Sequence, residues 1–296
     1  MVSNHFSKPL SNKQAVISML VCSIMWSIGG IFIKLIPWNP IIIAGIRSLI
    51  ALPVVYIYIR LAGLKLKLNK KNVFTGLFLF MTIILFVPAT KLTTAANAIV
   101  LQYSSPVFII LLNIFLYKQR PRRKDLFAVI AAMAGILLCF ADKFGASSPT
   151  SLLGDFLAIL SGIGVAVFFV FGNKSDSLDD NLSAIFAGHL ITFACSVPFI
   201  LLSPPVLTPS SAAFILLLGV VQIGIPYILY GRAIKAASPL MCSLLAMLEP
   251  LLNPVWVFIG VGEKPSVFSL LGGVIVIAVV TVWSLSNIKD AANNTL

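Results

Sequence analysis

The feature that most constrains this chain is a series of ten apolar stretches, each about long enough to cross a lipid bilayer. A membrane helix needs about 20 mostly apolar residues to cross a hydrocarbon layer of about 30 Å. The 296 residues are 59% hydrophobic and 10% charged, whereas a soluble domain has about 25% charged residues. The mean hydropathy is +1.05. A water-soluble core cannot bury this much apolar surface, so we predict an integral membrane protein.

We expect every span to be a helix, because in lipid each backbone N–H and C=O must be paired within its own segment. The runs lack the period-2 alternation of a membrane β-barrel. Only Lys91 separates the third span from the fourth, and the fifth is short, so these boundaries are soft. The predicted fold class is an all-α integral membrane protein with ten transmembrane helices: Gln14–Ile33, Ile41–Ile59, Val73–Thr90, Leu92–Tyr117, Leu126–Ala141, Phe156–Asn173, Leu182–Leu202, Ala212–Gly231, Pro239–Gly262 and Ser266–Asn287.

The basic residues predict the orientation, because cytoplasmic loops carry an excess of Lys and Arg. Of the 21 lysines and arginines, Arg47 lies inside a span. With the N-terminus inside, 16 fall on the inner side and four on the outer side: Lys34, Lys91, Lys143 and Lys264. We therefore predict a multi-pass protein of the cell (plasma or inner) membrane with cytoplasmic N- and C-termini. Because the basic residues are confined to short loops, the net charge of +12 does not indicate a nucleic-acid partner.

The chain matches itself without gaps at an offset of 144 residues, from the end of span three to the start of span five. The matched pairs include Lys91 with Lys235, Pro106 with Pro250, and Arg120-Pro121 with Lys264-Pro265. We predict two five-helix repeats, residues 1–145 and 146–296. Because five is odd, the second repeat enters the membrane from the opposite side. Such inverted repeats are typical of secondary transporters, and the alternative is a duplication retained only for packing.

Several short motifs occur in a fixed order along the chain. They are Trp26-Ser27 and Gly30, Pro40 with Arg47-Ser48, Ala237-Ser238-Pro239, Glu249-Pro250-Leu251, Gly262-Glu263 and Leu271-Gly272-Gly273. In this order, the sequence resembles an EamA-type permease of the drug/metabolite transporter superfamily over essentially its whole length. It departs from the family pattern at Gln119, where the first half often has an acidic residue, and at Ser105, which stands opposite Glu249. The resemblance implies a small-solute permease, commonly an exporter of amino acids or related metabolites.

Glu249 is the sharpest candidate for a transport residue. It lies about ten residues into span nine, roughly 15 Å deep at 1.5 Å per residue, and so near the bilayer midplane. An ionisable side chain at this depth usually faces an aqueous cavity or a partner. The neighbouring Pro250 has no N–H, so it leaves the carbonyl of Ala246 available to a substrate. The alternative is a structural glutamate that is hydrogen-bonded across the bundle.

Two more ionisable residues lie within the spans. Arg47 is about six residues, roughly 9 Å, from the outer end of span two. It is either a counter-charge for a substrate carboxylate or a structural residue that forms an ion pair or snorkels toward the headgroups. His189 in span seven is either a proton relay or a hydrogen-bonded structural residue.

Aromatic and polar side chains at membrane depth predict a mostly apolar pocket with a few polar points. The aromatic candidates, which are otherwise interface anchors, are Trp26, Tyr103, Tyr227, Tyr230 and Trp256, and the polar candidates are Asn97, Gln102, Ser104 and Gln222. Four prolines are expected to interrupt spans three, four, eight and nine, as hinges or as static bends: Pro88, Pro106, Pro226 and Pro250. The small residues Gly272 and Gly273 are assigned to close helix packing.

The chain lacks the sequence motifs of hydrolases, metalloproteases and P-loop ATPases. We therefore predict a protein that is not an enzyme, with no catalytic residues, no metal site and no cofactor. The four cysteines lie within spans and are interpreted as small buried apolar residues.

The predicted function is secondary transport of a small organic metabolite by alternating access. Export of an amino acid or a related metabolite is the first hypothesis, with proton coupling as one option. The alternatives are an importer or exchanger, for example of a nucleotide-like solute, and a non-transporting membrane scaffold. The predicted partners are a small-molecule substrate and the lipid bilayer, and the sequence leaves monomer and homodimer open.

Overall fold

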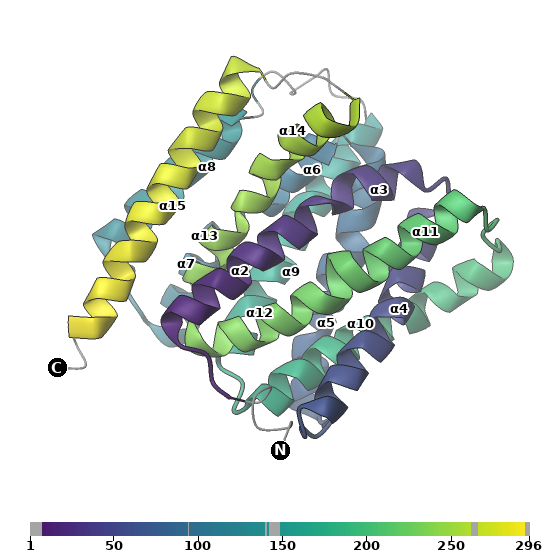
Figure 1. Ribbon diagram of the computed structural model, residues 1–296, viewed down its shortest axis with the longest axis horizontal. Coiled ribbons are helices and arrows are strands. Elements are labelled where there is room, and N and C mark those ends of the chain that lie inside the picture. Colours follow the sequence, from purple (N-terminus) through teal and green to yellow (C-terminus); the bar gives the residue numbers. More distant parts are fainter. Residues whose placement is uncertain (1–7, 94, 140, 142–148, 262–265, 294–296) are drawn as a thin grey trace.

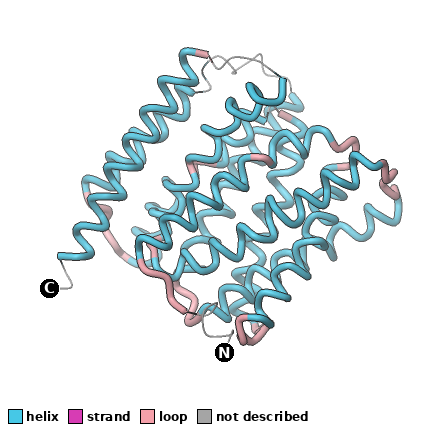
Figure 2. The backbone as a smooth tube through the Cα atoms, viewed as in Figure 1, coloured by secondary structure: helices cyan, strands magenta, loops and turns pink. Residues whose placement is uncertain are grey.

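The computed structural model describes residues 8–93, 95–139, 141, 149–261 and 266–293 (Figure 1). In this part of the chain helices account for almost all of the regular structure, and short loops join them (Figure 2). Eight helical segments are long and apolar enough to cross a membrane. The two other predicted spans are also helical, one with 17 residues and one in two pieces. The predicted all-α membrane fold is thus confirmed, while Lys143, Gly262, Glu263, Lys264 and Pro265 lie outside the described residues.

The first five predicted spans are built from seven helices. Span one consists of α2 and α3, and span four of α6 and α7. The helices are α2 (Asn12–Ser27), α3 (Gly29–Leu35), α4 (Pro40–Leu61), α5 (Lys70–Leu92), α6 (Ala95–Gln102), α7 (Ser105–Tyr117) and α8 (Arg123–Cys139).

The last five spans are built from α9 to α15 and one π-helix. Span eight consists of α11, the π-helix η2 and α12, and span nine of α13 and α14. The elements are α9 (Pro149–Asn173), α10 (Leu178–Leu202), α11 (Pro209–Leu217), η2 (Leu218–Gly224), α12 (Ile225–Ala236), α13 (Pro239–Ala246), α14 (Leu248–Val261) and α15 (Val267–Asn293).

Several helices begin where an Asn, Ser or Thr side chain precedes a proline. The side chains of Asn39, Thr208 and Ser238 each accept a hydrogen bond from the first turn of the following helix. Such a cap satisfies one of the free N–H groups of the helix start, and proline at the first helical position loses no hydrogen bond there. The sequence therefore fixes these starts locally.

The prolines do not all interrupt their helices. Pro106 and Pro226 lie in the first turn of α7 and α12, and Pro250 lies in the first turn of α14, so each directly follows an interruption. The expected interruption is absent at Pro88, because α5 continues through it to Leu92. Pro88 has no N–H to donate to the carbonyl of Ile84, so α5 lacks one of its bonds there without ending.

The two halves pack as the predicted inverted repeats. When spans one to five are matched with spans six to ten, each extensive contact has a counterpart. The contact of α5 with α9 corresponds to that of α12 with α2, and the contact of α10 with α5 to that of η2 with α4. The α4–α10 and α8–α15 pairs are their own counterparts. The same offset of 144 residues relates the ends of α6 and α13, at Gln102 and Ala246.

A reciprocal pair of hydrogen bonds joins the ends of spans one and three. Lys91 Nζ donates to the carbonyl of Ile36 at 2.7 Å. In return, Lys34 Nζ donates to the carbonyl of Thr93 at 3.2 Å. The two lysines thus satisfy carbonyls at helix C-termini, which have no partner within their own helices. We call this arrangement a terminal staple.

The second repeat has the equivalent staple between spans six and eight. Lys235 Nζ donates to the carbonyls of Asn173 and Ser175, and Asn173 Nδ2 donates to the carbonyl of Ala237 at 3.1 Å. Lys235 follows Lys91 by 144 residues, and Ala237 follows Thr93 by the same number. Because the repeats are inverted, the two staples lie at opposite faces of the bundle.

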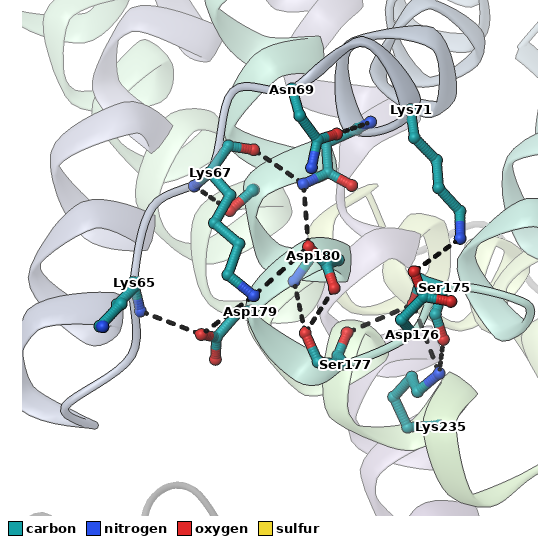
Figure 3. Close-up of polar contacts among 12 residues, drawn as sticks. Lys65, Lys67, Asn69, Lys71, Ser175, Asp176, Ser177, Asp179, Asp180 and Lys235 are labelled. Carbon is teal, nitrogen blue, oxygen red and sulfur yellow. Dashed lines mark hydrogen bonds and ion pairs between the residues drawn. The ribbon is translucent and has the colours of Figure 1, made fainter.

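Ion pairs surround the second staple (Figure 3). Lys67 Nζ lies 3.6 Å from carboxylate oxygens of both Asp179 and Asp180, and Lys71 Nζ lies 2.8 Å from Asp176 Oδ2. They tie Lys67 and the first turn of α5 to Asp176 and the first turn of α10. These exposed pairs add little stability individually, but together with the staple they form a polar network at this face.

Candidate functional site

A cavity of about 70 Å³ lies where the two repeats meet, with room for several water molecules. Spans one, two, three, four, six, eight and nine contribute to its wall. The polar and charged lining residues are Arg47, Thr82, Gln102, Ser105, Gln222, Ser243 and Glu249, and the aromatic ones are Trp26, Phe86, Tyr103, Phe169 and Tyr227. The described residues contain no group of three or more His, Cys, Asp or Glu side chains that could hold a metal ion.

Glu249 presents a buried carboxylate to the cavity. Its residue is 9% exposed, and Tyr103 Oη donates a hydrogen bond of 2.6 Å to Glu249 Oε2. Tyr103 lies in the interruption between α6 and α7, while Glu249 lies in the first turn of α14, just after the matching interruption. The helix N-terminus beside it favours a negative charge. The two broken helices therefore hold the carboxylate at the repeat interface.

Arg47 supplies the positive charge of the cavity. Its residue is 2% exposed, and its Nη1 donates to Gln222 Oε1 at 3.1 Å. Arg47 Nε has no hydrogen-bond partner among the described residues. Arg47 and Glu249, which are both described, do not form an ion pair with each other. Each charge is thus held by a neutral side chain and can still bind a further group.

The backbone of η2 and the start of α3 position Gln222. Gln222 Nε2 lies 3.4 Å from the carbonyl of Trp26, to which it donates. A Cβ atom on Gly29 would lie 2.7 Å from Gln222 Nε2, so a larger residue at this point of span one would displace the Gln222 amide. π-helical turns often occur at functional sites. The interruptions in spans one and eight therefore cooperate to place the partner of Arg47.

Aromatic rings form the apolar side of the cavity. The ring centroids of Trp26 and Tyr227 are 5.6 Å apart, and those of Phe169 and Tyr230 are 4.5 Å apart. These separations are typical of favourable aromatic pairs. Trp26 Nε1 is buried and has no hydrogen-bond partner in the described part of the chain. The wall thus combines a large apolar surface with an unused donor.

The structure brings seven of the ten predicted binding or coupling residues together around this cavity: Trp26, Arg47, Gln102, Tyr103, Gln222, Tyr227 and Glu249. Three do not line it. His189 lies behind Tyr227, with ring centroids 5.3 Å apart, and its Nδ1 is 3.4 Å from Ser48 Oγ. Tyr230 is fully buried among aromatic rings. Asn97 is in the first repeat near the staple, where its Nδ2 donates to Thr93 Oγ1 at 3.4 Å.

The sequence reasoning missed the hydroxyl residues of the wall. Ser105 Oγ lies 3.0 Å from Ser243 Oγ, and this hydrogen bond connects α7 with α13 across the repeat interface. Thr82 lines the cavity from α5. One signal was available, because Ser105 is the repeat counterpart of Glu249. Nothing in the local sequence distinguishes Ser243 or Thr82 from a packing residue.

A mostly apolar cavity with a few polar and charged side chains, between two inverted helical repeats and beside interrupted helices, is the arrangement of a membrane transporter. The family comparison agrees: the model of the EamA-like transporter family matches residues 13–141 and 152–285. The chain belongs to this family, within the drug/metabolite transporter superfamily. It is therefore a multi-pass membrane transporter and not an enzyme, and the resemblance stated from its motifs is confirmed.

Individual relatives support this assignment. The chain is 29% identical to an uncharacterized transporter of Archaeoglobus fulgidus, over 64% of this chain and 67% of the relative. It is 24% identical to the uncharacterized transporter YxxF of Bacillus subtilis, over 69% of this chain and 66% of the relative. A protein of known crystal structure aligns with a TM-score of 0.79 over 94% of this chain and 98% of the other, at 18% identity. That similarity concerns the fold alone.

Proposed function

We propose that this transporter exports an amino acid or a related small metabolite by alternating access. One observation carries the proposal: Arg47 from the first repeat and Glu249 from the second line the same buried cavity without pairing with each other. A guanidinium binds a carboxylate with strong, charge-assisted hydrogen bonds, and a carboxylate binds an ammonium group. A zwitterion can satisfy both groups at once, and the aromatic wall accepts an apolar side chain.

We also propose that Glu249 couples transport to protons. A buried carboxylate without a cationic partner is costly to keep ionised. In the cavity its only described hydrogen bond comes from Tyr103. When the ammonium group of a substrate leaves, a proton is the simplest replacement. Exchange of a substrate for a proton at one carboxylate would make export run on an inward proton gradient.

The interrupted helices and the staples support the movement that alternating access requires. Spans one, four, eight and nine are interrupted beside the cavity, and such breaks let one end of a helix move relative to the other. The two staples hold the ends of spans one and three at one face, and of spans six and eight at the other. We propose that the outward-open form loses the Lys91 staple and the inward-open form loses the Lys235 staple.

The proposed orientation has both termini in the cytoplasm. The predicted excess of basic residues on the inner side supports it. The Lys235 staple and its ion pairs would then face the cytoplasm, and the Lys91 staple would face outward.

A flux assay in proteoliposomes tests the proposal. The purified full chain is reconstituted, and a panel of radiolabelled metabolites competes for flux with and without a pH gradient. We expect saturable flux of a zwitterion that a pH gradient accelerates. Arg47→Gln should weaken substrate binding, whereas Arg60→Gln at the exposed end of the same helix should not. Glu249→Gln should remove the effect of the pH gradient.

Two results would count against the proposal. If the flux of Glu249→Gln responded to the pH gradient as the wild type does, Glu249 would be excluded as the coupling residue. Saturable transport of a solute that has no carboxylate and no ammonium group, with no competition by zwitterions, would exclude the proposed substrate class.

A further inference from the structure

Two adjoining cavities lie away from the central site: one is lined by α7, the start of α8, the start of α13 and α15, and the other lies between α8 and α15. The first has a volume of about 160 Å³ and a wall of mixed polarity, with Arg120, Arg122 and Asp125 among its lining residues. The second has a volume of about 300 Å³ and is mostly apolar, with Phe127, Val279 and Val282 in its wall and Lys124 at its edge. They share one lining residue, Trp283. The cavity with charged lining residues and the mostly apolar groove thus meet at Trp283.

Hydrogen bonds fix the wall between the two cavities. Trp283 Nε1 donates to Asp125 Oδ1 at 3.0 Å. The guanidinium of Arg122 binds the same carboxylate through Nε and Nη2, both at 3.0 Å, and its Nη2 also donates to Asn287 Oδ1. Lys124 Nζ donates to Ser286 Oγ at 3.2 Å. The start of α8 and the end of α15 therefore form a preorganised rim.

The rim carries a surplus of positive charge. The segment 118–124 contains five basic residues and no acidic residue: Lys118, Arg120, Arg122, Arg123 and Lys124. Asp125 offsets only one of them, and it is engaged by Arg122. Arg120 lines the first of the two cavities and is exposed. The rim therefore favours an anionic ligand.

The groove below the rim is suited to a hydrocarbon chain. Phe127 and Val282 are 70% and 69% exposed although they lie on transmembrane helices. In a membrane, exposed apolar side chains of this kind contact the lipid acyl chains. Basic pockets beside transmembrane helices bind anionic lipid headgroups. We propose that these two cavities form a binding site for an anionic phospholipid, with its phosphate at Arg120 and Lys124 and an acyl chain along Val279 and Val282.

Charge favours lipid over a second copy of the chain as the occupant. A two-fold dimer presents the same patch from both partners. The basic rims of two copies would then face each other across the interface, and like charges at close range are unfavourable. An anionic headgroup instead neutralises the rim.

Native mass spectrometry of the detergent-purified full chain tests the site. The chain is titrated with phosphatidylglycerol and, separately, with phosphatidylcholine of the same acyl chains. One basic residue near an anionic headgroup changes the affinity by about fivefold. We expect a preference for phosphatidylglycerol of about 25-fold in the wild type, and a loss of about fivefold in each of Arg120→Gln and Lys124→Gln. Arg60→Gln, which removes an exposed arginine on α4, serves as the matched control and should keep the preference.

A second pair of variants tests the groove. Ala278 lines it, whereas the neighbouring Ile277 does not. Ala278→Phe should reduce the binding of both lipids, and Ile277→Phe should reduce neither. Phosphatidylglycerol with brominated acyl chains should quench tryptophan fluorescence in the wild type more than in Trp283→Phe, which locates the chain.

Several outcomes would overturn the proposal. Equal binding of the two lipids by the wild type would exclude a headgroup site, as would an equal loss in Arg60→Gln and Arg120→Gln. Displacement of phosphatidylglycerol by inorganic phosphate would assign the rim to a free anion. A dimer that Ala278→Phe dissociates would assign the groove to a second copy.

Discussion

Gly272 and Gly273 are adjacent in α15, but Gly272 packs closely against α8 and Gly273 faces open space. The pair therefore provides a test of the packing between α8 and α15. A Cβ atom on Gly272 would lie 2.4 Å from both the carbonyl oxygen of Gly135 and the amide nitrogen of Cys139 on α8. A Cβ atom on Gly273 would have no heavy atom within 4 Å. Gly272→Ala should therefore force α8 and α15 apart, while Gly273→Ala should not.

The magnitude follows from the geometry. Ordinary contacts of a Cβ begin at 3.4 Å, so the helices must separate by about 1 Å. Overpacking of this kind costs about 1–3 kcal/mol. The separation also weakens the bond of 2.8 Å from Ser269 Oγ to the carbonyl of Cys139, which contributes about 1 kcal/mol. Both variants gain about 1 kcal/mol of helix propensity. We therefore expect Gly272→Ala to be about 2–4 kcal/mol less stable than Gly273→Ala.

Unfolding of the purified variants in mixed micelles of increasing SDS fraction measures this difference. Thiol labelling provides a second readout, because Cys139 is buried between the helices and Cys195 is exposed. Cys139 should react faster in Gly272→Ala, with Cys195 as the internal standard. Stabilities of the two variants within about 0.5 kcal/mol of each other would refute the reasoning, since the close approach of the helices would then have no energetic consequence.

Three further predictions concern the network, the cavity and the orientation. Lys235→Met should lower the free energy of unfolding by about 1–2 kcal/mol, because two carbonyls lose their donor. Lys71→Met removes only an exposed ion pair and should cost less than about 0.5 kcal/mol in the same measurement. Tyr103→Phe removes the bond of 2.6 Å to the central carboxylate, so flux in proteoliposomes should fall about tenfold. In intact cells, an impermeant thiol reagent should label Val206→Cys and not Lys118→Cys; the reverse would invert the proposed orientation.

The membrane fold was largely predictable because the bilayer itself imposes it. Each apolar run must become a helix, whatever its neighbours are. The offset of 144 residues also matched Lys91 with Lys235, and in the structure each lysine donates to carbonyls at helix ends of its own repeat. The interruption at Ile28 was not predictable, since no proline or other local signal marks it; in the structure it lies next to the close approach of Gly29 and Gln222, which are distant in sequence.

The sequence predicted how deep each candidate residue lies in the membrane, but not toward which neighbours its side chain points. Hydropathy and residue count place Glu249 and His189 within their spans, because the helical rise is constant. They do not give the rotation of each helix about its axis. Glu249 faces the cavity, whereas His189 lies behind Tyr227. That rotation depends on packing between spans, for which a single sequence has no local signal.

The equivalence of the two staples has an energetic consequence for the transport cycle. Because the same register of residues forms both staples, the ratio of the two open forms in the proposed cycle depends on the difference in stability between the staples, to which the ion pairs around Lys235 contribute. A change of about 1.4 kcal/mol in the free energy of one staple shifts that ratio tenfold. Substitutions of Lys91 and of Lys235 should therefore bias the resting conformation toward opposite sides of the membrane, and the double variant should return it close to the balance of the unaltered chain.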